Sequence, residues 1–278
     1  MVSLMFCKVN LRHDIVSGKI PGVFILSFFL VQFFFSGSGN YMLETGRKMQ
    51  AVELFSFSLT SPVTYLFFFL AMMVLLSGIP RVNGNAFCYL IRSDRTRWFV
   101  GQCLYNLLLS AGYMTWLLLC YLVALKGQFT FDNNWSEPIY LVAQTGIVQD
   151  VGININIWIS YEIIQNYTPV SLFATILFVQ MLLMFLLGVV FMVFTFFDWK
   201  KISYVIVVLL WAESFGFQQF NVKPSLWKLC PVGASWPSFW NYGYLKGAPT
   251  LKFVVIEYSV LIIMLLLLAK KRLKYFEF

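Results

Sequence analysis

The chain has 278 residues, of which 60% are hydrophobic and 12% are charged, and its mean hydropathy is +0.76. Water-soluble domains hold about 45–50% apolar and about 25% charged residues, so this composition excludes a soluble globular protein. The net charge of +8 is better explained by membrane orientation than by nucleic-acid binding. The sequence therefore predicts an all-α integral membrane protein that does not bind nucleic acid.

The first 20 residues contain no run long enough to cross a membrane. Apolar residues alternate here with basic ones, which is typical of a helix lying in the membrane interface. We predict an N-terminal amphipathic interfacial helix over residues 1–20, with a frayed tail as the alternative. The apolar members are Val9, Leu11, Ile15 and Val16, and the basic and polar members are Lys8, Arg12, His13 and Lys19.

Six apolar runs follow, and a membrane-spanning helix needs about 20 such residues. The predicted transmembrane helices lie near residues 21–36, 62–80, 99–125, 170–197, 202–218 and 252–269. The break between the fourth and fifth runs is brief, which favours a tight helical hairpin. All 278 residues would form a single transmembrane domain.

The lysines and arginines indicate the orientation of these spans. Thirteen of the 20 lie in the N-terminal segment, the second and fourth connectors and the C-terminus. Positive residues accumulate on the cytoplasmic side of membrane proteins. The sequence therefore predicts a multi-pass protein of the cell membrane with both termini in the cytoplasm and an acidic external loop at residues 126–169.

The external connector before the last span is rich in proline and aromatic residues. Proline interrupts helices, while Trp and Tyr favour the level of the lipid headgroups. We predict a re-entrant-like aromatic segment, with a plain aromatic loop as the alternative. Its characteristic residues are Pro224, Trp227, Pro231, Trp236, Pro237, Trp240, Tyr242 and Tyr244.

Motifs for catalysis or metal binding are missing from the sequence. A phosphate-binding loop requires Gly-x-x-x-x-Gly-Lys followed by Ser or Thr, but the only Gly-Lys pair, Gly18-Lys19, is followed by Ile20. The five cysteines form no Cys-x-x-Cys pair, and His13 is the only histidine. We therefore predict no catalytic residue, no metal site and no cofactor in this chain, and a membrane-embedded enzyme is disfavoured.

Two acidic residues lie inside predicted spans, where charge is costly and so marks function. By helical rise, Glu213 and Glu257 are expected in the outer half of the membrane at comparable depth. They could face each other, pair with Lys246 or Lys252, or contact a substrate. The favoured interpretation is that they bond to the aromatic segment.

A polar stripe is expected to face protein instead of lipid. Gln102, Asn106 and Ser110 recur every four residues and so share one face of the third span. Such residues usually join transmembrane helices to one another.

Residues 89–98 read Tyr-Leu-Ile-Arg-Ser-Asp-Arg-Thr-Arg-Trp and run directly into the third span. A basic elbow here, six spans and an aromatic segment before the last span together make the chain resemble the permease subunits of ABC type 2 exporters. The resemblance implies that two permease chains pair, as a homodimer or a heterodimer, each docked on a separate ATPase subunit that binds ATP and Mg. The elbow would be a cytoplasmic coupling helix contacting the ATPase through Tyr89, Arg92, Asp94, Arg95, Arg97 and Trp98.

The same resemblance implies that the second and fifth spans line the substrate path. The side chains concerned would be Tyr65, Phe68, Phe69 and Met72 from one span and Tyr204, Trp211 and Phe215 from the other. Aromatic walls suit a peptide, a drug or a lipid-like cargo.

Three alternatives stay open. The elbow arginines could serve only to set the topology and bind lipid phosphates. The chain could be a non-transporting sensor or immunity subunit that binds a peptide at the outer surface. It could also be a proton-coupled secondary transporter that uses Glu213 and Glu257.

Overall fold

The computed structural model describes residues 2–60, 62–80, 94–155, 157, 159–220, 222–243 and 245–275. Five helices in these ranges are long and apolar enough to cross a membrane, so the chain is a helical multi-pass membrane protein. They are α2 (Lys19–Thr45), α6 (Arg95–Ala124), α9 (Pro169–Phe196), α10 (Lys200–Gln219) and α12 (Leu251–Leu273). The strands found in the described residues are β1 (Met49–Gln50) and β2 (Phe129–Thr130), which pair in parallel.

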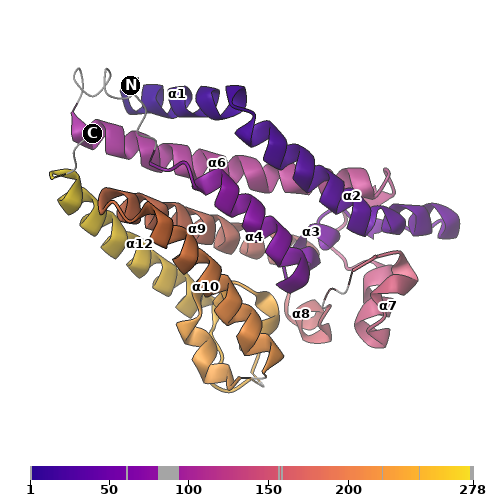
Figure 1. Cartoon of the computed structure of the whole chain (residues 1–278). Coiled ribbons are helices and arrows are strands. Elements are labelled where there is room, and N and C mark those ends of the chain that lie inside the picture. The colour runs from indigo at the N-terminus through magenta and orange to yellow at the C-terminus, as the bar shows by residue number, and fades with distance from the viewer. Residues whose placement is uncertain are drawn as a thin grey trace.

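The predicted second span is shorter than expected. Helix α4 (Pro62–Leu76) has 15 residues, or roughly 22 Å at 1.5 Å per residue, against about 30 Å of hydrocarbon. Residues 77–80 continue it as a turn. Helix α4 nevertheless runs back from the far end of the bundle toward the end that holds both termini (Figure 1). There the Lys19 ammonium, at the start of α2, donates a hydrogen bond of 2.9 Å to the Leu75 carbonyl.

Local sequence explains where the long helices begin. The Asp94 carboxylate accepts a bond from Thr96 N and caps α6. Thr168 and Ser171 form a reciprocal capping box at the start of α9, where Pro169 occupies the first turn. Such caps satisfy backbone N–H groups that have no partner within the helix.

The core is centred on α9, which packs against α6, α10 and α12. Gly188 lets α6 approach, since a Cβ atom there would lie 2.3 Å from the Asn106 side chain. Asn106 in turn donates a 3.0 Å bond to the Phe185 carbonyl. Gln102, Asn106 and Ser110 are all buried, which confirms that this stripe faces protein.

Helix α1 (Val2–Val16) lies along the first part of α6 (Figure 1). Its Asn10 donates a 3.0 Å bond to the Gln102 carbonyl oxygen, and Asp14 accepts one from the Tyr105 hydroxyl. Leu4, Leu11, Ile15 and Val16 are exposed instead. The helix predicted for the N-terminal segment is therefore present. Its bundle side holds Asn10 and Asp14 together with Phe6 and Cys7, and its exposed side mixes these apolar residues with Lys8 and Arg12. Its place in the membrane interface stays a prediction.

Short helices gather at the end of the bundle away from the termini (Figure 1). They are α3 (Glu53–Ser58), α7 (Glu137–Thr145), η1 (Val148–Val151) and α8 (Tyr161–Asn166). The aromatic segment between α10 and α12 also folds into short helices: η2 (Pro224–Leu229), α11 (Pro231–Ala234) and η3 (Pro237–Phe239). Together they form the end of the bundle opposite the termini, which we call the outer end.

Glu53 fastens the loop after α6 to α3. Its buried carboxylate accepts hydrogen bonds from Ser136 N (2.7 Å), Ser136 Oγ (2.6 Å) and Gln50 N (3.0 Å). A separate close contact joins α2 to the residue after η1: a Cβ atom on Gly37 would lie 2.3 Å from the Gly152 carbonyl oxygen. Burial raises the pKa of Glu53 to about 7, because a low-dielectric site disfavours the charged form.

This raised pKa predicts how stability responds to pH. A folded-state pKa above the ordinary carboxyl value contributes stability that is complete in acid and is lost as the pH rises through about 7. The melting temperature of the purified wild type should therefore fall between pH 5 and pH 8, and the difference corresponds to about 3 kcal/mol at most. Glu53→Gln should flatten this slope.

Glu44→Gln, which alters an exposed carboxylate at the end of α2, should keep the wild-type slope. Equal slopes in the wild type and Glu53→Gln would contradict the assignment. The measurement is a thermal melt in a single detergent at several pH values.

Candidate functional site

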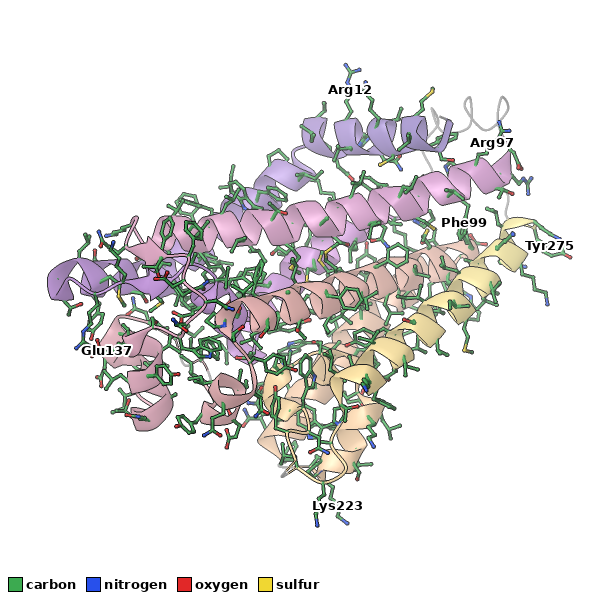
Figure 2. All side chains as sticks on the ribbon, turned by 180° about the vertical axis from the view of Figure 1, so that it is seen from behind. Arg12, Arg97, Phe99, Glu137, Lys223 and Tyr275 are labelled. Carbon is green, nitrogen blue, oxygen red and sulfur yellow. The ribbon has the colours of Figure 1, made fainter. Side chains whose placement is uncertain are left out.

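The start of α6 and the end of α12 meet in a cluster of cations, which we call the basic end. The Arg95 guanidinium donates bonds to the Leu273 carbonyl (3.2 Å) and the Lys274 carbonyl (2.9 Å). Figure 2 shows Arg97 and Tyr275 at this end and Glu137 at the other. Further cations nearby are Lys270, Lys271 and Arg272 in the last turn of α12.

The residues predicted to dock a partner are placed differently from one another. Tyr89 and Arg92 lie outside the described residues. Trp98 is buried, with its ring 6.1 Å from that of Phe196. Arg95 holds α12, and Asp94 and Arg97 are exposed. Among the described members, Asp94 and Arg97 are therefore the ones best placed to meet a partner, and their docking role stays a prediction.

The aromatic side chains predicted to line a path lie mostly inside the chain. Tyr65 and Phe69 of α4 are buried, as are Phe68 and Met72. Tyr204 and Trp211 of α10 are partly exposed. The outward face of α4 carries Val63, Leu70 and Val74 instead.

Tyr65 connects α4 to the aromatic segment through α9. Its hydroxyl donates a 2.9 Å bond to Gln180 Oε1, and Gln180 Nε2 donates a 3.3 Å bond to Ser235 Oγ. The Tyr65 ring also meets the Trp236 ring edge-on at 5.6 Å. A displacement of the aromatic segment would therefore also displace α4.

Glu213 and Glu257 approach the aromatic segment near Cys230. Burial, with a smaller contribution from the nearby carboxylates of Glu213 and Glu257, raises the pKa of the Cys230 thiol to about 11, although hydrogen bonds with Ser214 and Gly233 act in the opposite direction. In the described part of the chain neither forms an ion pair with Lys246 or Lys252. Oε2 of Glu257 is buried without a hydrogen-bond partner there.

Their helical neighbours form the bonds that were expected of the glutamates. Ser214 Oγ lies 2.8 Å from Cys230 Sγ, and the Tyr258 hydroxyl donates to the Pro231 carbonyl. The prediction placed Glu213 and Glu257 in contact with the aromatic segment. The hydrogen bonds described there are made instead by the uncharged residues next to them in the sequence.

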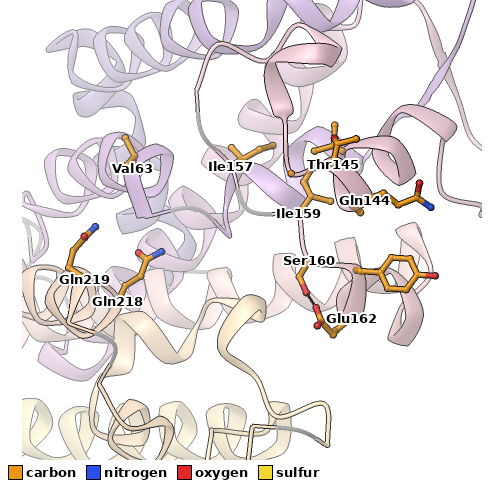
Figure 3. Close-up of a pocket in the computed structure, with 13 residues that line it drawn as sticks. Val63, Gln144, Thr145, Ile157, Ile159, Ser160, Glu162, Gln218 and Gln219 are labelled. Carbon is orange, nitrogen blue, oxygen red and sulfur yellow. Dashed lines mark hydrogen bonds between the residues drawn. The ribbon is translucent and has the colours of Figure 1, made fainter.

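A pocket of about 660 Å³, which we call the outer pocket, opens where α4, α7, α8 and α10 converge (Figure 3). An adjoining aromatic pocket of about 380 Å³ lies over the segment between α10 and α12. The two share Ser160, Glu162 and Gln218. The remaining residues of the outer pocket are Val63, Val142, Ala143, Gln144, Thr145, Gly146, Ile157, Ile159, Tyr161 and Gln219.

The shared wall presents hydrogen-bond acceptors. Ser160 donates to Oε2 of Glu162, and Oε1 of Glu162 accepts no bond from a described residue. Oε1 of Gln218 is also buried without a partner in the described chain. In the aromatic pocket the Trp227 ring stacks on that of Phe239 at 3.9 Å and meets that of Phe217 edge-on at 5.8 Å.

The sequence did not single out this pair of pockets. Glu162 lies within the predicted acidic loop at residues 126–169, and Gln218 lies at the end of the predicted span near residues 202–218. The Gln218-Gln219 pair closing an apolar run was the available signal. Its meeting with Glu162 depends on how residues 126–168 fold back over α10, and no local pattern reveals that.

The Tyr65 connection predicts a stability loss. Tyr65→Phe leaves the buried Gln180 oxygen without its donor, which costs about 1–3 kcal/mol, so the melting temperature should fall. Tyr204→Phe is the matched control, because the Tyr204 hydroxyl has no hydrogen-bond partner in the described chain. Equal melting temperatures for the two variants would refute the connection.

The chain matches no protein-family model, no curated protein and no solved structure. The resemblance to exporter permeases therefore stays a prediction from the sequence, and the grounds for a function lie in the basic end and the two pockets.

Proposed function

We propose that the chain is the membrane subunit of an ATP-driven exporter, with six spans, both termini cytoplasmic and a separate ATPase as the source of energy. Two such chains, or this chain and a second permease, would enclose the path of an amphipathic cargo such as a peptide, a drug or a lipid-like molecule. The chain itself would carry no catalytic group, and ATP and Mg would bind to the partner.

The basic end is the observation that carries this proposal. Arg95 ties the beginning of α6 to the end of α12, so a push on one helix reaches the other. Residues 81–93, which include Arg81 and Arg92, join α4 to α6 in the sequence just before this point. A soluble partner docked here would act on α4, α6 and α12 at once.

Transmission to the outer end has a physical route. Helix α4 is tied to α2 by the Lys19–Leu75 bond at one end and to the aromatic segment through Tyr65, Gln180 and Ser235 at the other. Movement of α4 would therefore displace the aromatic segment, which contains Cys230 and lines the aromatic pocket. Alternating access requires this kind of coupling between the two sides of a membrane.

Charge reversal at the basic end tests the proposal. Affinity purification of the wild type in mild detergent should recover a P-loop ATPase. Arg97→Glu should lower that recovery at least tenfold, since loss of a charged contact across an interface costs roughly 2–5 kcal/mol and 1.4 kcal/mol is tenfold. Arg97 is preferred to Arg95 because it does not hold α12.

Lys223→Glu is the matched control, since it reverses an exposed charge after α10, far from Arg97 (Figure 2). It should leave ATPase recovery unchanged. Purification of the wild type without any ATPase would contradict the exporter proposal.

A second candidate is a sensor or immunity subunit that binds its ligand without moving it. The outer pocket favours this function, because it offers a binding site outside the helical core. An ATPase that copurifies but is not stimulated by ligand, together with no ligand movement in vesicles, would favour the sensor.

A further inference from the structure

The outer and aromatic pockets form one divided cavity with a chemically uneven lining. The outer pocket is bordered by the amide and hydroxyl side chains of Gln144, Thr145, Gln218 and Gln219. The aromatic pocket is bordered by Phe217, Trp227 and Phe239. Both volumes fall within the range of about 300–1,000 Å³ typical of ligand sites.

Two acceptors on the wall between the pockets have no donor among the described residues. Oε1 of Glu162 and Oε1 of Gln218 have no hydrogen-bond partner among the described residues, and the Gln218 atom is buried. A buried acceptor without a donor costs free energy unless a ligand supplies one. A positively charged donor would form the stronger bond with the Glu162 carboxylate.

The described cations of the chain do not border the wall between the pockets. Among the residues that the structure describes, no Lys, Arg or His lines either pocket. Nearby, Lys228 lies over the Phe253 ring at 5.6 Å, and Lys223 is exposed and points away from the bundle (Figure 2). The described ion pair of the outer end joins Arg47 to Glu137, which border neither pocket.

We propose that the two pockets bind a cationic amphipathic peptide, with a guanidinium or ammonium group at Glu162 and Gln218 and a neighbouring aromatic side chain against Trp227 and Phe239. The glutamine amides of the outer pocket both donate and accept, which matches the N–H and C=O groups of a peptide backbone. Stacked aromatic rings favour another aromatic or a cationic group beside them.

The biological role of this site rests on the proposed function, in which the exporter would meet its cargo here at the outer surface. The cavity and the unpartnered acceptors do not depend on that role. Binding to the isolated chain therefore tests the site, while ATPase recovery tests the exporter.

The experiment measures saturable binding of a labelled arginyl-glycyl-tryptophan amide to the full chain in nanodiscs of phosphatidylcholine, which carries no net charge. The comparison ligand replaces arginine with citrulline, which keeps the shape and removes the charge. The wild type should bind the arginine peptide at least tenfold more tightly, as expected of about one charge-assisted hydrogen bond.

Glu162→Gln should remove most of that difference and leave the citrulline peptide unaffected. Asp150→Asn is the control, because Asp150 is an exposed acid of the same loop that borders neither pocket. It should bind both peptides as the wild type does.

Equal affinity of the wild type for the two peptides, or no saturable binding, would overturn the proposal even if Glu162→Gln failed to fold. Tighter binding of a small arylalkyl guanidine than of the arginine peptide would also overturn it, because the peptide backbone would then contribute nothing.

Discussion

Polar groups buried in an apolar chain must find partners inside the protein, and this constraint shapes the whole structure. Hydrocarbon offers no hydrogen bonds, so a buried polar atom must bond within its own helix, bond to another element, or remain unpaired at a cost in free energy. Tyr65, Gln180 and Ser235 join α4, α9 and the aromatic segment in this way. Glu53 does the same for α3 and the loop after α6. The bundle is thus held in register by a few polar links within a large apolar core.

Composition and hydropathy predicted the helical membrane class and the approximate places of the five long helices, because a span needs about 20 consecutive apolar residues. The first was predicted too short, since it was expected to end near residue 36 and α2 continues to Thr45. The buried stripe of Gln102, Asn106 and Ser110 was predictable for the same reason, since it needs only the helical period. The second span was predicted too long, because the uncharged residues 77–80 form a turn that hydropathy does not distinguish from helix.

The candidate sites depend on contacts between distant segments, and these were not predictable. Ser214 and Tyr258, instead of the neighbouring Glu213 and Glu257, hold the aromatic segment, since a rotation of about 100° per residue decides which side chain faces it. The outer pocket needs Glu162 beside Gln218, which are 56 residues apart in the sequence. Only the tertiary fold brings them together.

The attachment of α1 to α6 has a consequence for how the protein is made. Asn10 and Asp14 bond to Gln102 and Tyr105, which are 92 and 91 residues further along the chain. During synthesis the first helix therefore emerges long before its partners exist. Until then Asn10 and Asp14 lack these partners, while Leu4, Leu11 and Ile15 of the same helix stay exposed even in the final structure. Helix α1 can therefore make these bonds only after α6 has been translated.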